Sequence, residues 1–253
     1  MDLQLRGKTA FISGSSQGIG FAIAEQLLKE GASVIINGRN KEKLEQAISQ
    51  LQPLGKVSGI AGDIATIDAP PVDILVNNVG IFGLKSFFEL TDEDWLHYFN
   101  VNVMSSVRLS RALMPSMLEK KWGRIIFISS ESGVNIPANM IHYGMTKTAM
   151  LSISRGLAQL TKGTEVTVNT ILGGPTYSDG VKTAIESISA VQNVPVALLK
   201  DNIFATTNPG SLLGRFLHAA EIAQLAAYLA SPLSIATNGA ALRADGGVLN
   251  TIL

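Results

Sequence analysis

The run TAFISGSSQGIG at residues 9–20 decides the fold, because it joins a short extended segment to three closely spaced glycines. Residues 9–13 have the apolar and β-branched composition of a buried strand. Gly14, Gly18 and Gly20 permit a tight turn and a close backbone approach to a ligand, and a helical pattern begins behind them. A glycine turn between a strand and a helix presents free N–H groups to a phosphate. The stretch therefore predicts a dinucleotide-binding unit, with an ordinary tight turn as the alternative.

Six further strand-like runs extend this pattern to the end of the chain. They cover residues 34–37, 57–61, 73–77, 124–129, 166–172 and 240–244. Helical patterns lie between them; Leu44, Ala47, Ile48 and Leu51, for example, recur at the spacing of one helix face. Alternating strands and helices predict a parallel sheet that is covered on both faces. We therefore expect an α/β fold with a single Rossmann-type, doubly wound parallel sheet of about seven strands.

The organisation of the chain predicts one unit. No linker, repeat or low-complexity segment divides it, so we expect a single dinucleotide-binding and catalytic domain over residues 1–253. Asn40 and Thr91 have the character of helix N-caps, and Thr91 should open a long helix. Only nine residues separate Asp63 from Asp73, fewer than a usual crossover needs. We expect the helix at that crossover to be reduced to a turn or missing.

The composition excludes several classes of function. The 20 Lys and Arg balance the 20 Asp and Glu, which argues against nucleic-acid and anionic-membrane partners. The chain has no cysteine for a thiol nucleophile, and its three scattered histidines form no metal-ligand motif. The chain start lacks a signal peptide pattern, and the uncharged stretch 222–242 is interrupted by Pro232. We expect a cytoplasmic protein without a metal, a membrane or a nucleic-acid partner.

Several short motifs occur in a fixed order along the chain. They are the spacing G-x-x-x-G-x-G at Gly14–Gly20, then Asn77-Asn78-Val79-Gly80, Tyr143-Gly144-Met145-Thr146-Lys147 and Asp245-Gly246-Gly247. Together they resemble the short-chain dehydrogenase/reductase family over essentially the whole chain, near the 3-oxoacyl reductases. The resemblance implies an oxidoreductase that interconverts a carbonyl and a secondary alcohol. It also implies a homotetramer or homodimer, because relatives often pair their long helices.

The same resemblance implies a catalytic set of Ser130, Tyr143, Lys147 and Asn102. Tyr143 and Lys147 are four residues apart and so share one helix face. We expect Tyr143 to exchange a proton with the substrate oxygen, while the Lys147 ammonium lowers the pKa of the phenol. Ser130 would donate to that oxygen, and Asn102 would hold a water that links Lys147 to solvent. A cofactor-binding sensor or scaffold without turnover is the alternative function.

The end of the second expected strand indicates which cofactor binds. NAD enzymes of this kind carry an acidic residue there, whereas Gly38 and Arg39 occupy the position here. A guanidinium suits a 2′-phosphate, which favours NADP(H); a solvated charge that opens a helix is the alternative for Arg39. The expected cofactor-binding residues are Gly14, Ser16, Gln17, Gly18, Ile19, Gly20, Arg39, Asp63, Ile64, Asn78, Gly80, Tyr143, Lys147, Thr176 and Ser178.

Residues 175–214 form the least regular region of the sequence, with three prolines. By the resemblance this insertion is a substrate lid. Its mainly apolar side chains favour an apolar small-molecule substrate, with packing of the lid on itself or on another subunit as an equal alternative. Two neighbours of the catalytic set complete the interpretation. Glu131 is expected to be an exposed loop charge, with substrate contact as the alternative, and His142 a pocket-lining or structural residue.

Overall fold

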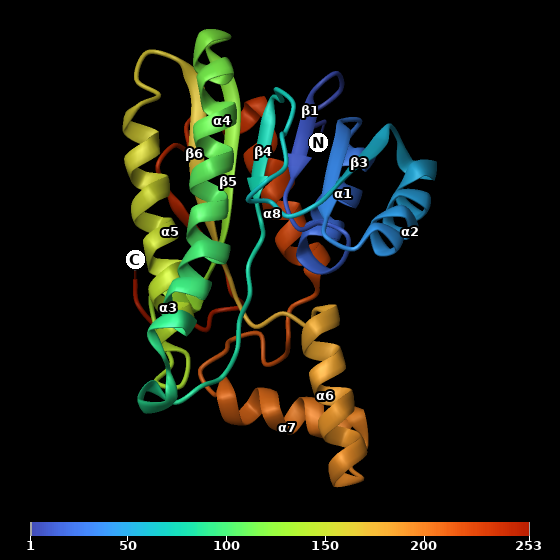
Figure 1. Cartoon of the computed structure of the whole chain (residues 1–253), viewed down its shortest axis with the longest axis vertical. Helices are drawn as coiled ribbons and strands as arrows, with labels where there is room; N and C mark the ends of the chain where they lie inside the picture. Colours follow the sequence, from blue (N-terminus) through green and yellow to red (C-terminus); the bar gives the residue numbers. More distant parts are fainter. Residues whose placement is uncertain (1, 253) are drawn as a thin grey trace.

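A computed structural model describes residues 2–252 (Figure 1). Seven parallel strands form one sheet in the order β3-β2-β1-β4-β5-β6-β7. The strands are β1 (Thr9–Ile12), β2 (Ser33–Gly38), β3 (Val57–Ala61), β4 (Ile74–Asn77), β5 (Trp122–Ser130), β6 (Glu165–Gly173) and β7 (Ala241–Ala244). Each expected strand is found, and its ends shift by at most two residues. The Rossmann-type doubly wound sheet is therefore confirmed.

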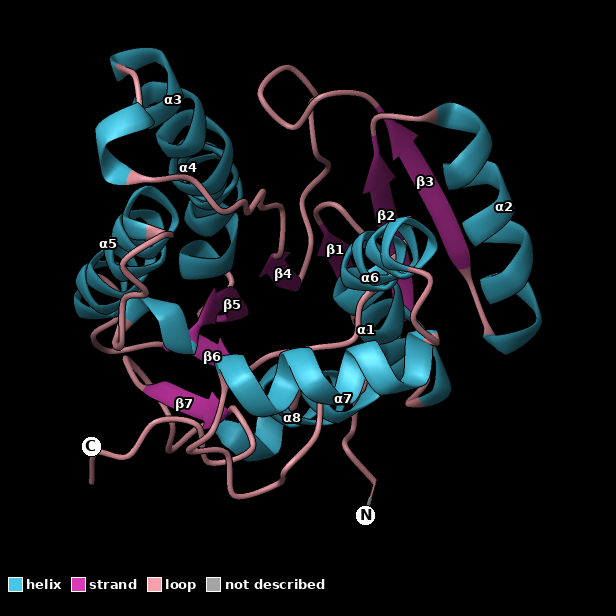
Figure 2. Ribbon diagram, turned by 90° about the horizontal axis from the view of Figure 1, so that it is seen from below, coloured by secondary structure: helices cyan, strands magenta, loops and turns pink. Residues whose placement is uncertain are grey.

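Helices cover both faces of the sheet, as Figure 2 shows. One face carries α1 (Gly18–Lys29), α2 (Lys41–Leu51) and α8 (Ala219–Ala230), and the other carries α4 (Ser105–Glu119) and α5 (Ile141–Gln159). Each face has its own buried apolar cluster. This arrangement explains the nearly uninterrupted apolar character of the strands, because a strand covered on both sides has no solvent face.

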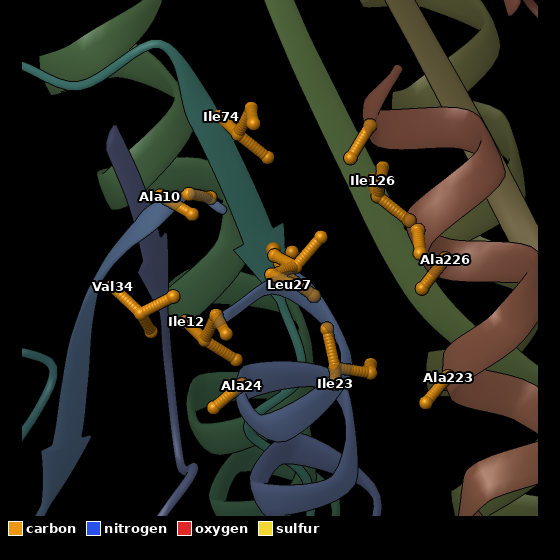
Figure 3. Packing of buried hydrophobic residues seen from close by; sticks show 14 of the residues in the cluster. Ala10, Ile12, Ile23, Ala24, Leu27, Val34, Ile74, Ile126, Ala223 and Ala226 are labelled. Carbon is orange, nitrogen blue, oxygen red and sulfur yellow. The ribbon is translucent and has the colours of Figure 1, made fainter. Parts of the chain in front are cut away.

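The core beneath α1 and α8 shows how the sheet is fixed to these helices. In Figure 3 the strand residues Ile12 and Ile126 point toward Ile23 and Leu27 of α1 and toward Ala226 of α8. All five side chains are fully or almost fully buried. The small alanines let α8 approach the sheet closely. Burying such side chains contributes about 1.5–3 kcal/mol for each large aliphatic residue.

The predicted N-caps are present. Asn40 accepts a hydrogen bond from the backbone N–H of Lys43, and Thr91 forms a capping box with Asp94 at the start of α3 (Asp92–Tyr98). The expected long helix after Thr91 is also present, but it contains a π-helical turn between α3 and α4. Such turns insert one residue into a helix and often mark functional sites. This one contains Asn102.

The crossover from β3 to β4 carries no helix, as its length predicts. Residues 62–73 run as a turn followed by irregular chain. The turn begins at Asp63, whose carboxylate accepts the backbone N–H of Ala65 at 2.8 Å. Within residues 2–252, no helix is long and apolar enough to cross a membrane.

Residues 175–214 are more regular than expected. They contain α6 (Asp179–Gln192) and α7 (Val196–Thr207), which lie beyond the end of the sheet in Figure 1. The expectation of an irregular segment was wrong because its prolines fall outside these helices; Pro195 is the N-cap of α7. Helical spacing was present in the sequence: Val181, Ile185 and Ile188 recur every three or four residues.

Candidate active site

A cleft of about 930 Å³ lies along the carboxyl ends of the strands. It crosses the point between β1 and β4 where the strand order reverses, the usual ligand site of an open α/β sheet. Its walls include the expected cofactor residues Gly14, Ser16, Gln17, Gly18, Ile19, Arg39, Asp63, Ile64, Asn78, Gly80, Tyr143, Lys147 and Ser178. Two expected residues, Gly20 and Thr176, do not line it.

Gly20 supports the glycine turn from behind. A Cβ atom at this position would lie 2.5 Å from the Asn78 side-chain nitrogen and 2.8 Å from the Gly14 carbonyl oxygen. The Asn78 amide donates to the carbonyl oxygens of Ser13 and Gly14, at 3.0 and 2.9 Å. The turn after β4 thus holds the turn after β1, and only glycine permits this approach. Gly20 therefore packs closely behind the turn, and its contact with the cofactor stays a prediction.

Thr176 is turned away from the cleft. Its hydroxyl donates to the Gly174 carbonyl oxygen at 2.9 Å, and its backbone forms a bridge with Leu217. The side chain is buried there. The side chain does not line the cleft because the strand-like pairing after β6 fixes its direction, and its contact with the cofactor stays a prediction. Ser178, two residues later, does line the cleft.

The glycine turn accepts an anion in this structure. The backbone N–H of Gly18, at the start of α1, donates to a carboxylate oxygen of Asp179 at 2.9 Å. Asp179 is the first residue of α6, so the carboxylate comes from the segment after β6. A carboxylate oxygen here stands in for a phosphate oxygen, which the same N–H and the helix dipole would attract. The turn therefore fits the pyrophosphate of a dinucleotide.

The cleft wall beyond β2 is basic. Arg39 and Lys43 both line it; Arg39 precedes the N-cap of α2, and Lys43 lies in the first turn of that helix. A Cβ atom at Gly38 would lie 3.0 Å from the Ser16 hydroxyl oxygen, so Ser16 occupies the space of a larger side chain. The sequence analysis missed Lys43. Its place in the first helical turn after Arg39 and the Asn40 N-cap is the signal that could have revealed it.

The four expected catalytic residues come together. Ser130 ends β5, and Tyr143 and Lys147 lie one turn apart on α5. The Lys147 Nζ lies 5.6 Å from the centre of the Tyr143 ring and donates to the Ile128 carbonyl oxygen at 2.9 Å. A Cβ atom at Gly80 would lie 3.4 Å from the Lys147 Nζ and 3.6 Å from the Asn102 Oδ1. Lys147 and Asn102 therefore meet beside Gly80, and Ser130 joins the group through a hydrogen bond with Tyr143.

Asn102 is held by three hydrogen bonds. Its Oδ1 accepts the backbone N–H of Ile81 at 2.7 Å, and its Nδ2 donates to the Ile81 carbonyl oxygen at 2.9 Å and the Thr146 hydroxyl at 3.0 Å. The side chain is fully buried. Asn102 thus connects the π-helical turn to the loop after β4 and to α5. This arrangement fixes the position of α5 relative to the cleft.

Burial determines the charges of the pair on α5. It raises the pKa of Tyr143 well above the ordinary value of 10; hydrogen bonding with Ser130 opposes this shift and the charge of Glu131 adds to it. Burial also lowers the pKa of Lys147 to about 8, against the attraction of Glu131. The expected lowering of the Tyr143 pKa is therefore wrong for the protein without ligands, because desolvation is the largest influence on this phenol and raises its pKa.

Glu131 is not the exposed loop charge that the sequence indicates. It is half-buried, and its carboxylate accepts hydrogen bonds from the Ser130 hydroxyl and from the backbone N–H of Ser132, the latter at 2.7 Å. His142, in contrast, is a packing residue. It is buried, and its ring centre lies 4.2 Å from that of Tyr98 in an edge-to-face contact.

A sheet with an anion-accepting glycine turn, and with the half-buried Tyr143 and the buried Lys147 beside that turn, is the arrangement expected of a dinucleotide-dependent oxidoreductase. The chain belongs to the short-chain dehydrogenase family, whose model matches residues 8–188. It is 45% identical to the uncharacterized oxidoreductase YvaG of Bacillus subtilis, with 100% of each chain covered. It is 30% identical to the 3-oxoacyl-[acyl-carrier-protein] reductase FabG of Vibrio harveyi, over 97% of this chain and 99% of that one.

A solved structure resembles the whole chain. The L-sorbose reductase of Gluconobacter frateurii, complexed with NADPH and L-sorbose, superimposes with a TM-score of 0.93 at 30% sequence identity. The match covers 100% of both chains. The family and the neighbour establish an oxidoreductase of the short-chain type that acts on a small molecule. Among residues 2–252, no group of three or more potential ligands could hold a metal ion.

Proposed function

We propose that the protein is an NADP(H)-dependent enzyme that interconverts a small carbonyl compound and its secondary alcohol by hydride transfer. The observation that carries the proposal is the position of Tyr143 and Lys147 in the cleft that contains the glycine turn, with Ser130 hydrogen-bonded to Tyr143 beside them. A bound nicotinamide supplies the hydride chemistry, and the protein positions and polarises the reactants. The intact proton-handling set disfavours a sensor or scaffold without turnover.

Tyr143 is the general acid and base in this proposal. Its raised pKa keeps the phenol protonated, so it is ready to donate to the substrate oxygen during carbonyl reduction. Ser130 would donate to the same oxygen, as in a small oxyanion site. Lys147 would hold the ribose hydroxyls of the cofactor. Asn102 is a positioning residue, because its side chain holds the loop after β4 and Thr146 of α5.

NADP(H) is the proposed cofactor because the wall beyond β2 is basic and lacks a carboxylate. Arg39 and Lys43 would bind a 2′-phosphate, and Gly38 leaves no acidic side chain to repel it. The NADPH bound in the L-sorbose reductase structure supports this choice. Gly14, Gly18 and Ile19 would hold the pyrophosphate, and Asp63 and Ile64 the adenine.

The substrate would enter between the catalytic set and α6 and α7. Phe82 and Ile136 are 55% and 45% exposed beside this space, and the Phe82 ring lies 6.5 Å from that of Tyr143. Such walls suit a substrate with an apolar part. We include residues 175–214 as the substrate lid of a single domain over residues 1–253. We also include assembly into a homotetramer or homodimer, which the exposed apolar side chains of Leu84, Phe87 and Phe88 before α3 favour.

Consumption of NADPH in the presence of a panel of ketones tests this function. Tyr143→Phe should bind NADPH as the wild type does, yet lose about 10²–10⁴-fold in turnover, the usual contribution of general acid–base catalysis. Retained turnover in this variant would contradict the role of Tyr143. Tight binding of NADPH by the wild type without turnover of any ketone would favour the sensor.

A further inference from the structure

The carboxylate of Glu131 lies beside the hydroxyl that is expected to bind the substrate oxygen. Ser130 ends β5, and residues 131–133 form a short helical turn directly after it. The Ser132 backbone N–H donates to both the Ser130 Oγ, at 3.1 Å, and the Glu131 Oε2, at 2.7 Å. The Ser132 hydroxyl donates to the Glu131 Oε1 at 3.1 Å. The carboxylate is therefore fixed in place next to Ser130 rather than extended into solvent.

This geometry creates a competition for one proton. A serine hydroxyl carries a single hydrogen, and here Ser130 donates it to Glu131. A substrate carbonyl oxygen needs the same hydrogen. A ketone that takes it leaves the half-buried carboxylate with one donor fewer, which costs free energy. A ketone with its own hydroxyl next to the carbonyl can donate to Glu131 in exchange.

We propose that Glu131 determines substrate specificity by accepting a hydrogen bond from a substrate hydroxyl next to the reacting carbonyl. The enzyme then favours α-hydroxy ketones and the corresponding vicinal diols over unsubstituted ketones. It disfavours substrates that carry a carboxylate at that place, because two anions would meet there. This inference rests on the proposed function and narrows its substrate class.

The distances support the exchange. Two successive hydrogen bonds through the Ser130 hydroxyl span at most about 6 Å, so an oxygen bound to Ser130 lies within one short substrate group of Glu131. The charge of Glu131 also reaches Tyr143 and Lys147, whose pKa values it raises. The side chains of Phe82 and Ile136 offer no hydrogen-bond acceptor. Glu131 therefore supplies a carboxylate acceptor beside the hydroxyl that would hold the reacting oxygen.

Three small probes with the same carbon skeleton test the inference. They are hydroxyacetone, acetone and pyruvate, compared by kcat/KM with NADPH as the reductant. The wild type should prefer hydroxyacetone. Glu131→Leu should lower the hydroxyacetone-to-acetone ratio at least about tenfold, because a site built for a hydrogen bond discriminates strongly against its absence. Glu131→Gln keeps an acceptor, so it should retain most of this ratio while improving the use of pyruvate.

The control is Glu119→Gln, which removes the same charge from an exposed position on the last turn of α4. It should leave the hydroxyacetone-to-acetone and hydroxyacetone-to-pyruvate ratios of kcat/KM unchanged. A merely structural role of Glu131 would lower kcat/KM for hydroxyacetone and acetone by the same factor. An unchanged ratio in Glu131→Leu would therefore overturn the inference while leaving the proposed function intact.

A binding measurement separates this inference from the proposed function. Saturation-transfer NMR with NADP⁺ present compares propylene glycol with isopropanol as ligands of each variant. If the wild type reduces none of the ketones, the proposed function fails. The NMR result then still decides whether Glu131 accepts a hydrogen bond from a ligand hydroxyl. A preference for propylene glycol that is lost in Glu131→Leu supports the inference. Equal preference in the two proteins overturns it.

Discussion

The glycine turn and the lid helices border the same cleft, but they are held in opposite ways. The glycine turn is fixed by several strands: Ser15, for example, exchanges hydrogen bonds with Asn37 at the end of β2, at 2.8 and 3.0 Å. The lid helices α6 and α7 bury only Ile185, Leu199 and Phe204. Regions with little buried apolar surface open at low free-energy cost. The comparison indicates a rigid cofactor site beneath a lid that adjusts to its ligands.

The sharpest test of this comparison is a pair of glycine substitutions. Gly20→Ala forces a methyl group against Asn78 and the Gly14 backbone, whereas the nearest atom to a new methyl at Gly180 in α6 is 3.9 Å away. Overpacking costs about 1–3 kcal/mol, so Gly20→Ala should weaken NADPH binding by up to about a hundredfold and lower the Tm. Gly180→Ala should preserve or raise the Tm. Calorimetry measures the NADPH affinity of each variant, and thermal melts measure its Tm. Equal losses of affinity and Tm in the two variants would refute the comparison.

The rigid half of the site was largely predictable from the sequence. Short apolar, β-rich runs located the strands, and the four-residue spacing of Tyr143 and Lys147 placed both on one helix face. The N-caps at Asn40 and Thr91 were predictable because a cap depends on residues only three positions apart. These features are local, and the order of strands in a doubly wound sheet then brings distant loops together.

Features that depend on distant atoms were not predictable in the same way. The direction of the Tyr143 pKa shift follows from desolvation by many surrounding groups, which no spacing encodes. The hydrogen bond of Glu131 to Ser130 depends on how the chain turns after β5. Asp179 reaches Gly18 across 161 positions of sequence. These three features form only when the segments after β5 and β6 fold against the rest of the cleft.

Arg39→Asp tests the cofactor preference of the rigid half. The substitution removes a guanidinium and adds a carboxylate that would repel a 2′-phosphate. Charge-assisted hydrogen bonds contribute about 1.5–3 kcal/mol, so the ratio of kcat/KM for NADPH over NADH should fall about tenfold or more. Lys43→Ala should shift the ratio in the same direction by a smaller factor. An unchanged ratio in Arg39→Asp would show that Arg39 is only a solvated charge.

The pH dependence of NADPH binding tests Lys147. Its pKa is lowered from 10.5 to about 8, so the ammonium is present below that pH and is lost above it. Binding that uses the ammonium should therefore be constant at lower pH and weaken as the pH rises through about 8, by at most about tenfold per pH unit. Lys147→Met should bind more weakly and without this dependence. Fluorescence titration measures both, and the same pH profile in the two proteins would contradict the role of Lys147.

The smallest expected effect concerns Asp179, which connects the two regions. Its carboxylate occupies the Gly18 N–H that a pyrophosphate would use, so NADPH must displace it. Asp179→Asn removes the competing charge, and NADPH affinity should rise about two- to fivefold, in line with the modest net value of one hydrogen bond. Glu186→Gln removes the same charge further along α6 and should leave the affinity unchanged. Weaker NADPH binding in Asp179→Asn would mean that the carboxylate holds the lid in its binding position instead. The lid would then be part of the cofactor site, and the contrast between the two regions would fail.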